Sequence, residues 1–334
     1  MAFTIFVTAP KLAAAGLRIL EEAHCRVLFM QDGNCVAEVE ATMAREPIAA
    51  VISRTVELSA TAIASCPTLK VISKHGVGVS NIDVAAASAR RIPVYVTPGA
   101  NAQSVAELTL GLMLAAARKI PTLDRELHAG RWSRAQDGLQ LAGRRLGLVG
   151  FGQVGQRVAQ VAQVLGMEVH AFDPALNSTL SGTSPVPGVI LHRTLDALLP
   201  LSDVLSLHVP LNSHTRNLLN AQRLALLPHG AVLVNTARGE VVDEPALVAA
   251  LRSGALFAAG LDTMAVEPLP ADSPLAALPN VVLTPHVGGS TAAALDNMAA
   301  GAAHNVLGFL RAQVPQVSAC VNPSVFEPVQ GMTA

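Results

Sequence analysis

Short apolar runs alternate with helical patterns along most of the chain. Strands are expected at the apolar runs 3–8, 48–53, 69–73, 94–96, 146–149, 168–172, 203–207, 231–235, 258–261 and 281–284. Helices are expected at 11–23, 102–119 and 154–165, between the later strands, and after 291 as far as about 310. Because strands that alternate with helices pair in parallel, this pattern predicts an α/β protein.

The stretch 146–174 places a glycine-rich turn between a strand and a helix. After the apolar run 146–149 comes the sequence Gly150-Phe151-Gly152-Gln153-Val154-Gly155. The first glycine permits a tight turn, the second lets backbone approach a pyrophosphate, and the third lets the helix pack on the strand. The N-terminus of the helix points N–H groups at the phosphates. These features predict a dinucleotide-binding unit, and an ordinary buried α/β turn is the alternative.

Asp173 ends the second strand of this unit. A carboxylate in this place is suited to accept hydrogen bonds from the hydroxyl groups of an adenosine ribose. Its charge would repel a 2′-phosphate, and no Arg or Lys occurs at 174–180. The sequence therefore favours NAD over NADP.

The length and the breaks in the pattern predict two domains. A chain of 334 residues exceeds the usual size of one hydrophobic core. No glycine fingerprint follows the first strand, and Thr97-Pro98-Gly99-Ala100 resembles a crossing between domains. The tail at 314–334 is expected to return to the first domain. We therefore expect a dinucleotide domain at 100–289, inserted between the two parts of a substrate domain, 1–99 and 290–334.

The helix expected at 102–119 is apolar nearly all round, which is typical of a helix buried between domains or against a second subunit. The net charge of −1 and 14% charged residues indicate neither a nucleic-acid partner nor an anionic membrane surface. No apolar run reaches 18 residues, and the N-terminus lacks the pattern of a signal peptide. The four cysteines lack metal-ligand spacing, so we expect no metal and a cytoplasmic protein with reduced thiols.

Three residues near the ends of late strands suit acid–base chemistry on a small acid. They are Arg238, Glu267 and His286. The guanidinium of Arg238 can bind a carboxylate and polarise a carbonyl. His286 titrates near neutrality and suits proton transfer, while Glu267 would orient its imidazole. Together they predict hydride transfer to a 2-oxo acid. Taken singly, each residue is more often an ordinary loop or turn residue.

The chain resembles the D-isomer-specific 2-hydroxyacid dehydrogenases, especially the phosphoglycerate dehydrogenase-like branch. The matching segments are KHGVGVSNID (74–83), NAQSVAELTLGLMLAAAR (101–118), GFGQVG (150–155), LHVPLNSHTRNLLN (207–220), VNTARGEVVDE (234–244), LDTMAVEP (261–268) and TPHVGGST (284–291). The resemblance implies a doubly wound Rossmann sheet inserted into a smaller, flavodoxin-like α/β substrate domain. It also implies that Arg238, Glu267 and His286 are the catalytic triad, and that the helix at 101–118 builds a homodimer.

The resemblance further implies a set of binding residues. The implied cofactor contacts, with the fingerprint glycines, are Gly150, Gly152, Gln153, Val154, Gly155, Asp173, Val209, Thr236, Ala237, Asp262, Gly288 and Gly289. Backbone N–H groups near Val77 and Gly78 would hold the substrate carboxylate. Arg54 could face the same cleft and bind a distal anionic group such as a phosphate, although a solvated surface position is the alternative.

These observations predict an NAD-dependent dehydrogenase that interconverts a small D-2-hydroxy acid and its 2-oxo acid. The leading substrate pairs contain 3-phosphoglycerate, glycerate/hydroxypyruvate or glyoxylate. The alternative is a dinucleotide-sensing binding protein of the same fold that acts through partner contacts. A steady-state assay beside a pull-down distinguishes the two.

Overall fold

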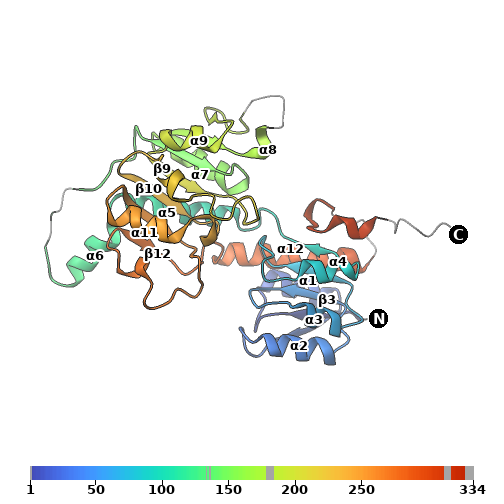
Figure 1. Ribbon diagram of the computed structural model, residues 1–334. Coiled ribbons are helices and arrows are strands. Elements are labelled where there is room, and N and C mark those ends of the chain that lie inside the picture. Colours follow the sequence, from blue (N-terminus) through green and yellow to red (C-terminus); the bar gives the residue numbers. More distant parts are fainter. Residues whose placement is uncertain (1, 133, 135–136, 178–183, 312–316, 328–334) are drawn as a thin grey trace. The chain divides into compact units, whose positions relative to one another are not determined.

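The computed structural model describes residues 2–132, 134, 137–177, 184–311 and 317–327. The chain forms two compact units. Unit 1 comprises Met1–Asn101 and Thr291–Ala334, and unit 2 comprises Ala102–Ser290. Each unit is built on a parallel sheet with helices on both faces (Figure 1). The α/β fold expected from the alternating pattern is confirmed.

Unit 1 has a five-stranded sheet with the order β2-β1-β3-β4-β5, which is the order of flavodoxin-like sheets. Its strands are β1 (Thr4–Val7), β2 (Arg26–Phe29), β3 (Ala50–Ser53), β4 (Val71–Lys74) and β5 (Val94–Tyr95). Its helices are α1 (Ala14–Glu22), α2 (Val36–Arg45), α3 (Ala60–Ser65), α4 (Val84–Ala89) and α12 (Ala292–Leu310), and its 3-10 turns are η4 (Val317–Ala319) and η5 (Pro323–Phe326).

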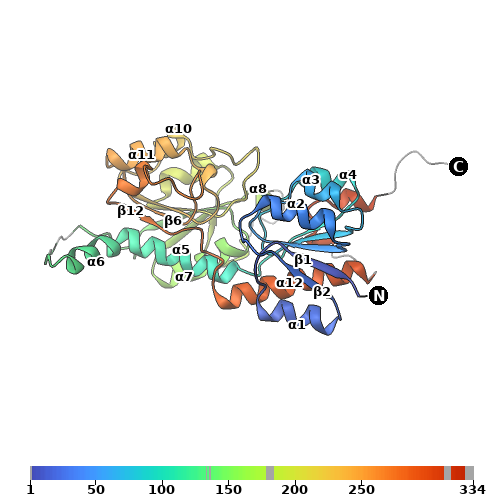
Figure 2. The same ribbon diagram turned by 90° about the horizontal axis from the view of Figure 1, so that it is seen from below.

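Successive residues of these strands enter two different cores. Ile5 and Val7 pack with residues of α1 and α12, whereas Phe6, between them, packs with residues of α2 and α3. This two-residue period follows from the pleat of a strand. Figure 2 shows α1 and α12 on one face of the sheet and α2, α3 and α4 on the other. Both faces are covered, so the strands β1 and β3 are fully buried and mostly apolar.

The described part of the C-terminal tail returns to β5, as the sequence predicts. Cys320 forms an antiparallel bridge with Tyr95, and the Val94 N–H donates to Asn322 Oδ1 over 2.8 Å. Residues 314–316 and 328–334 of the expected tail lie outside the described residues.

Unit 2 has a seven-stranded sheet with the order β12-β11-β10-β9-β6-β7-β8. Its strands are β6 (Arg145–Val149), β7 (Glu168–Phe172), β8 (Ile190–Leu191), β9 (Val204–Leu207), β10 (Ala231–Asn235), β11 (Leu256–Leu261) and β12 (Val281–Leu283). Its helices are α5 (Ala102–Ala117), α6 (Ile120–His128), α7 (Gln153–Val164), α8 (Pro174–Asn177), α9 (Leu195–Leu198), α10 (Ala221–Leu224) and α11 (Glu244–Arg252), and its 3-10 turns are η1 (Leu199–Leu201), η2 (Gly239–Val241) and η3 (Pro274–Ala277).

The strand order of unit 2 reverses at β6, which pairs with β7 on one side and β9 on the other. This is the Rossmann arrangement, in which a ligand binds outside the carboxyl ends of the strands at the reversal. Helices α5 and α7 cover one face of the sheet, and α10 and α11 cover the other (Figure 2).

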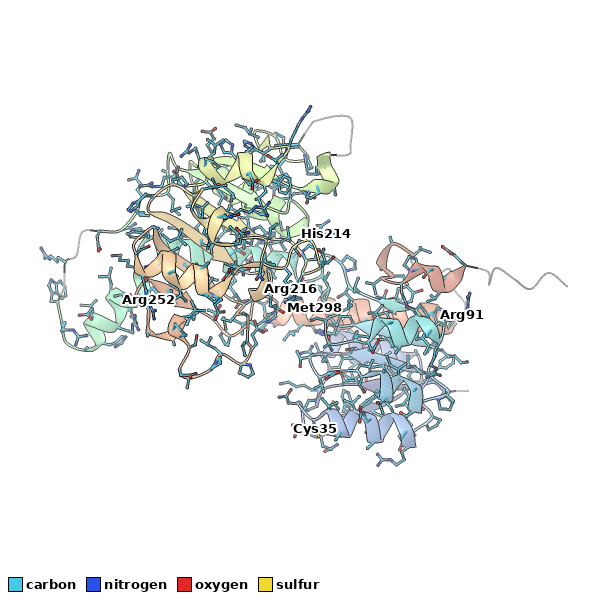
Figure 3. All side chains as sticks on the ribbon, viewed as in Figure 1. Cys35, Arg91, His214, Arg216, Arg252 and Met298 are labelled. Atoms are coloured by element: carbon cyan, nitrogen blue, oxygen red, sulfur yellow. The ribbon has the colours of Figure 1, made fainter. Side chains whose placement is uncertain are left out.

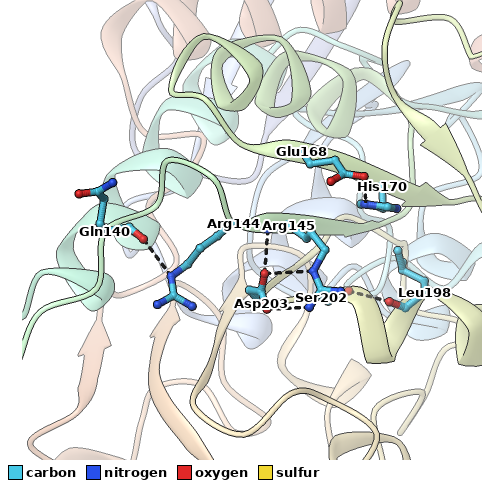
Figure 4. Close-up of polar contacts among 8 residues, drawn as sticks. All are labelled: Gln140, Arg144, Arg145, Glu168, His170, Leu198, Ser202 and Asp203. Carbon is cyan, nitrogen blue, oxygen red and sulfur yellow. Dashed lines mark hydrogen bonds and ion pairs between the residues drawn. The ribbon is translucent and has the colours of Figure 1, made fainter.

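A polar network lies at the amino ends of the strands of this sheet, where β6 begins. Arg145 donates to both carboxylate oxygens of Asp203, over 3.1 Å from Nε and 2.9 Å from Nη2 (Figure 4). Beside it, Ser202 Oγ donates to the Leu198 carbonyl, and a Cβ on Gly147 would lie 2.0 Å from that Oγ. The hydrogen bonds of Arg145 hold the pKa of the Asp203 carboxyl below its usual range. The network fixes β6 to the segment that precedes β9.

The expected strands do not include β2 and β8. The apolar pattern does not predict β2, because this edge strand begins with Arg26 and its other residues are only half-buried. One face of α5 is exposed in the single chain, at Gly111 and Leu114, while Leu112 and Met113 are buried, and the burial of this helix against a second subunit stays a prediction.

All four cysteines are free thiols, and half-buried Cys35 precedes α2 (Figure 3). In the part of the chain that the structure describes, no helix is long and apolar enough to cross a membrane.

Candidate active site

The carboxyl ends of neighbouring strands in unit 2 carry the residues expected to form the site. In sheet order from β12 to β7, these strands are followed by His286, Asp262, Arg238, Val209, Gly150 and Asp173. Parallel strands end at one edge, so the sheet gathers residues that are distant in the sequence.

The three glycines of the fingerprint have three different surroundings. Gly150 has a φ of 92°, and a Cβ there would lie 2.7 Å from the carbonyl carbon of His208. A Cβ on Gly155 would lie 2.6 Å from the Gly150 oxygen, so the start of α7 packs on the turn. A Cβ on Gly152 would meet no atom within 4 Å. The open side of Gly152 leaves room for a pyrophosphate at the N-terminus of α7, where N–H groups lack helical partners.

Asp173 lies directly after β7 and is tied to the glycine turn. Its Oδ2 accepts a hydrogen bond from the Phe151 N–H over 2.8 Å, and its Oδ1 accepts one from the Ala175 N–H over 2.9 Å. A carboxylate can accept about four hydrogen bonds, so both oxygens keep capacity for ribose hydroxyls. The residues of the turn and Asp173 therefore fit NAD.

His286 and Glu267 form a hydrogen-bonded pair beyond β12 and β11. The distance between His286 Nδ1 and Glu267 Oε2 is 2.7 Å. The other carboxylate oxygen of Glu267 accepts a hydrogen bond from the Met264 N–H over 3.0 Å. With Nδ1 engaged, Nε2 is the ring nitrogen of His286 left for proton transfer.

The buried carboxylate of Asp262 holds the backbone around His286. Its oxygens accept hydrogen bonds from the N–H groups of Val287 and Gly288, over 2.9 and 2.8 Å, and from Thr284 Oγ1 over 2.6 Å. The His286 N–H donates to the Asp262 carbonyl over 2.8 Å. His286 has a φ of 52°, a backbone conformation that residues other than glycine rarely adopt. Asp262 therefore stabilises the backbone that presents the imidazole.

The surroundings of Glu267 favour its charged form. Burial raises the pKa of the carboxyl, but the hydrogen bonds from His286 and the Met264 N–H and the charge of Arg238 outweigh burial and lower it below the usual value. The carboxylate can therefore stabilise a protonated imidazole on His286.

Arg238 lies next to the turn that carries Glu267. A Cβ on the following residue, Gly239, would lie 1.9 Å from the carbonyl carbon of Met264. The Asn235 side chain supports the same segment, because its Nδ2 donates to the Arg238 carbonyl over 2.9 Å and its Oδ1 accepts from the Ala237 N–H over 3.0 Å. Arg238 Nη1 donates to the Ala237 carbonyl over 2.6 Å.

The remaining expected cofactor residues lie along the same edge of unit 2. Thr236 is buried, and its hydroxyl lies 2.8 Å from that of Thr109 on α5. The Gly288 carbonyl accepts a hydrogen bond from Ser104 Oγ over 2.6 Å. Gln153 and Val154 are the first two residues of α7. Val154 is half-buried, and so are Val209, which follows β9, and Gly289, which follows β12.

The expected substrate residues Arg54, Val77 and Gly78 belong to unit 1 and follow β3 and β4. Within the described residues, the N–H groups of Val77 and Gly78 donate to no other group. Arg54 Nη1 lies 2.9 and 2.8 Å from the two ring nitrogens of the buried His75. Burial lowers the pKa of the Arg54 guanidinium. Burial and the charge of Arg54 together lower the pKa of His75 to about 4.

The contact between His75 and Arg54 is not predicted from the sequence. The position of His75 two residues before Val77 was the available signal. A second histidine, His208, packs against Gly150 through its backbone, and burial lowers its pKa to about 4. Within the described residues, no group of three or more His, Cys, Asp or Glu side chains could hold a metal ion.

Comparison with known proteins identifies the family. Residues 110–288 match the model of the D-isomer-specific 2-hydroxyacid dehydrogenase NAD-binding domain. Hydroxypyruvate reductase of Thermotoga maritima is 45% identical over 73% of this chain and 78% of that enzyme. D-3-phosphoglycerate dehydrogenase of Haemophilus influenzae is 41% identical over 74% of this chain, which spans 60% of that enzyme's length.

The fold is similar to solved structures over nearly the whole chain. The crystal structure of a Thermus thermophilus protein has a TM-score of 0.85 and 37% identity, covering 96% of this chain and 100% of the other. The two-domain Rossmann fold and the NAD-binding unit predicted from the sequence are confirmed. The chain belongs to the D-isomer-specific 2-hydroxyacid dehydrogenase family of oxidoreductases.

Proposed function

We propose that the protein transfers a hydride between NAD(H) and a small D-2-hydroxy acid/2-oxo acid pair. The leading substrate pairs contain 3-phosphoglycerate, glycerate/hydroxypyruvate or glyoxylate. The hydrogen bond of 2.7 Å between His286 and Glu267, beside Arg238 at the edge of the Rossmann sheet, carries the proposal. It provides an oriented proton donor next to a cation that suits a carboxylate or a polarised carbonyl.

The cofactor would lie along the residues that follow β6, β7, β9 and β10. When bound, NADH supplies the hydride. Arg238 would bind the substrate carboxylate and polarise the carbonyl, and His286 would donate the proton from Nε2 to the developing alkoxide. Glu267 would hold the imidazole through Nδ1 and stabilise its charge before that transfer.

We propose unit 1 as the substrate domain, with boundaries near 99 and 290. Among the described residues the N–H groups of Val77 and Gly78 have no hydrogen-bond acceptor, which supports a role in holding the substrate carboxylate. The half-buried charge of Arg54 supports a role with a second anionic group on the substrate. Within the described residues no carboxylate forms an ion pair with Arg54, so an anionic ligand would compensate its charge.

The test is an assay of NADH oxidation by the purified chain with glyoxylate, hydroxypyruvate, pyruvate and phosphohydroxypyruvate. We expect turnover with at least one of these acids and a preference for NADH over NADPH. No oxidation with any of them would count against the proposed reaction. The Arg54→Met variant should lose affinity for phosphohydroxypyruvate more than for glyoxylate.

We also propose a cytoplasmic homodimer built on α5. The exposed apolar residues Leu114 on α5 and Ile120 and Leu127 on α6 support an interface there, since they are 37%, 53% and 55% exposed. The four free thiols support a reducing compartment. Light scattering coupled to size exclusion should give twice the mass of the chain, and the Leu114→Glu variant should lower it.

A further inference from the structure

The short turn after β11 contains two consecutive peptide N–H groups that donate to two different carboxylates, those of Glu267 and Glu244. The Met264 N–H donates to Glu267 Oε1 over 3.0 Å. The next N–H, that of Ala265, donates to Oε2 of Glu244 over 3.0 Å. Glu244 is distant from this turn in the sequence and is the first residue of α11. One carboxylate from another element thus fixes the peptide adjacent to the one that holds Glu267.

The same peptide is restricted from a second side. A Cβ on Gly239 would lie 2.1 Å from the Met264 oxygen and 2.3 Å from the Ala265 nitrogen. The peptide bond between Met264 and Ala265 therefore lies close against the α-carbon of Gly239, and Glu244 holds its N–H.

The carboxylate of Glu244 is not the cap of its own helix. Asp243 caps α11, because its Oδ1 accepts the Ala246 N–H over 3.1 Å. Glu244 is half-buried and forms no ion pair within the described residues. Its contact with the turn is therefore the specific interaction that its side chain makes.

We infer that Glu244 is a positioning residue that holds Glu267 in place against His286. This inference rests on the proposed function, since it assigns His286 and Glu267 to the proton transfer. Without the Glu244 contact, the Ala265 peptide would turn, the Met264 N–H would follow, and Glu267 would leave its place beside Nδ1. A displacement of about 1 Å in such a group costs on the order of 100-fold in rate.

The test compares Glu244→Ala, Glu244→Gln and Glu240→Ala. Gln keeps an oxygen that can accept the Ala265 N–H but loses the charge that favours the N-terminus of α11. Glu240→Ala is the matched control, because it removes a glutamate of the same charge from the neighbouring turn η2. The Glu240 carboxylate lies 3.7 Å from the exposed Arg216 (Figure 3). The measurements are kcat, the KM for NADH, the pH profile and hydrogen exchange at the amides of Met264 and Ala265.

We expect Glu244→Ala to lower kcat by about 10- to 100-fold with the KM for NADH unchanged. In the pH profile of kcat for this variant, the acidic limb should move to higher pH, because the Glu267 carboxyl loses contacts that lower the pKa of that group. Both amides should exchange faster, while Glu244→Gln and Glu240→Ala stay near wild type. Equal impairment in Glu244→Gln, or wild-type kcat in Glu244→Ala, would overturn the inference. If the wild-type chain reduces no 2-oxo acid, the proposed function fails, and the amide exchange still tests the positioning role.

Discussion

The α-carbon of Gly239 lies against the peptide bond of Met264, so that a Cβ would be 1.9 Å from the Met264 carbonyl carbon. Arg238 precedes this contact and Glu267 follows it. One close backbone approach therefore sets the spacing between the guanidinium and the carboxylate of the candidate site.

The Gly239→Ala variant should lose both stability and activity. The added methyl group cannot be accommodated unless the turn at 264–267 moves, which would separate Glu267 from His286. We expect a loss of stability of about 1 to 3 kcal/mol, as for other overpacked sites. We also expect kcat to fall by a larger factor than the factor by which the KM for NADH changes. Urea unfolding and steady-state kinetics measure the two effects.

Gly308→Ala is the matched control for this substitution. Gly308 is half-buried on α12 of unit 1, outside the unit that holds Gly239 and α5, and a Cβ there would meet no atom within 4 Å. Alanine is about 1 kcal/mol better than glycine inside a helix, so this variant should be at least as stable as wild type. Equal losses in the two variants would show that crowding at Gly239 is not the cause.

Removal of the imidazole should abolish proton transfer without abolishing cofactor binding. We expect His286→Ala to lower kcat by about 10²- to 10⁴-fold, the range of general acid catalysis. NADH affinity, measured by fluorescence titration, should stay near wild type because the glycine turn is far along the sheet edge. The control is His214→Ala, which removes an exposed histidine of the same unit (Figure 3). Unchanged turnover in His286→Ala would remove this residue from the mechanism.

Asp173 should determine the preference for NADH. The Asp173→Asn variant removes the charge that repels a 2′-phosphate but keeps an oxygen that can accept the Phe151 N–H. We therefore expect the ratio of kcat/KM for NADH to that for NADPH to fall by about 10-fold or more, while thermal stability changes little. Asp173→Ala should lower the ratio and the melting temperature together, since it also loses the contact with the turn. An unchanged ratio in both variants contradicts the assignment.

The sequence predicts the parts of the site that depend on strand ends, and it does not predict the contacts between loops. The alternation of apolar runs locates β6, β7 and β10 closely, and a parallel sheet then places Gly150, Asp173 and Arg238 at one edge. The positions of Gly239 and Glu244 carry no such periodicity. Their roles depend on how η2 and the start of α11 approach the turn after β11, which the local pattern does not encode.

The contact between Arg54 and His75 should make the stability of the protein depend on pH. Unfolded histidine has a pKa near 6.5, whereas burial and the charge of Arg54 lower the pKa of His75 to about 4 in the folded chain. Between these values the unfolded state binds the proton and the folded state does not. Stability is therefore retained above about pH 6.5 and falls as the pH drops toward 4, by up to about 3 kcal/mol from His75.

The His75→Gln variant keeps a hydrogen-bond acceptor for Arg54 and removes this titration. Its free energy of unfolding, measured by urea titration from pH 7.5 to 4.5, should fall less steeply than that of wild type. His208, whose pKa is also about 4, contributes in the same direction and remains in the variant, so a slope should persist. The exposed His214 provides the control, because His214→Gln should follow the wild-type curve. Parallel curves for His75→Gln and wild type would mean that the pKa of His75 is the same in the folded and unfolded protein, which would contradict the prediction.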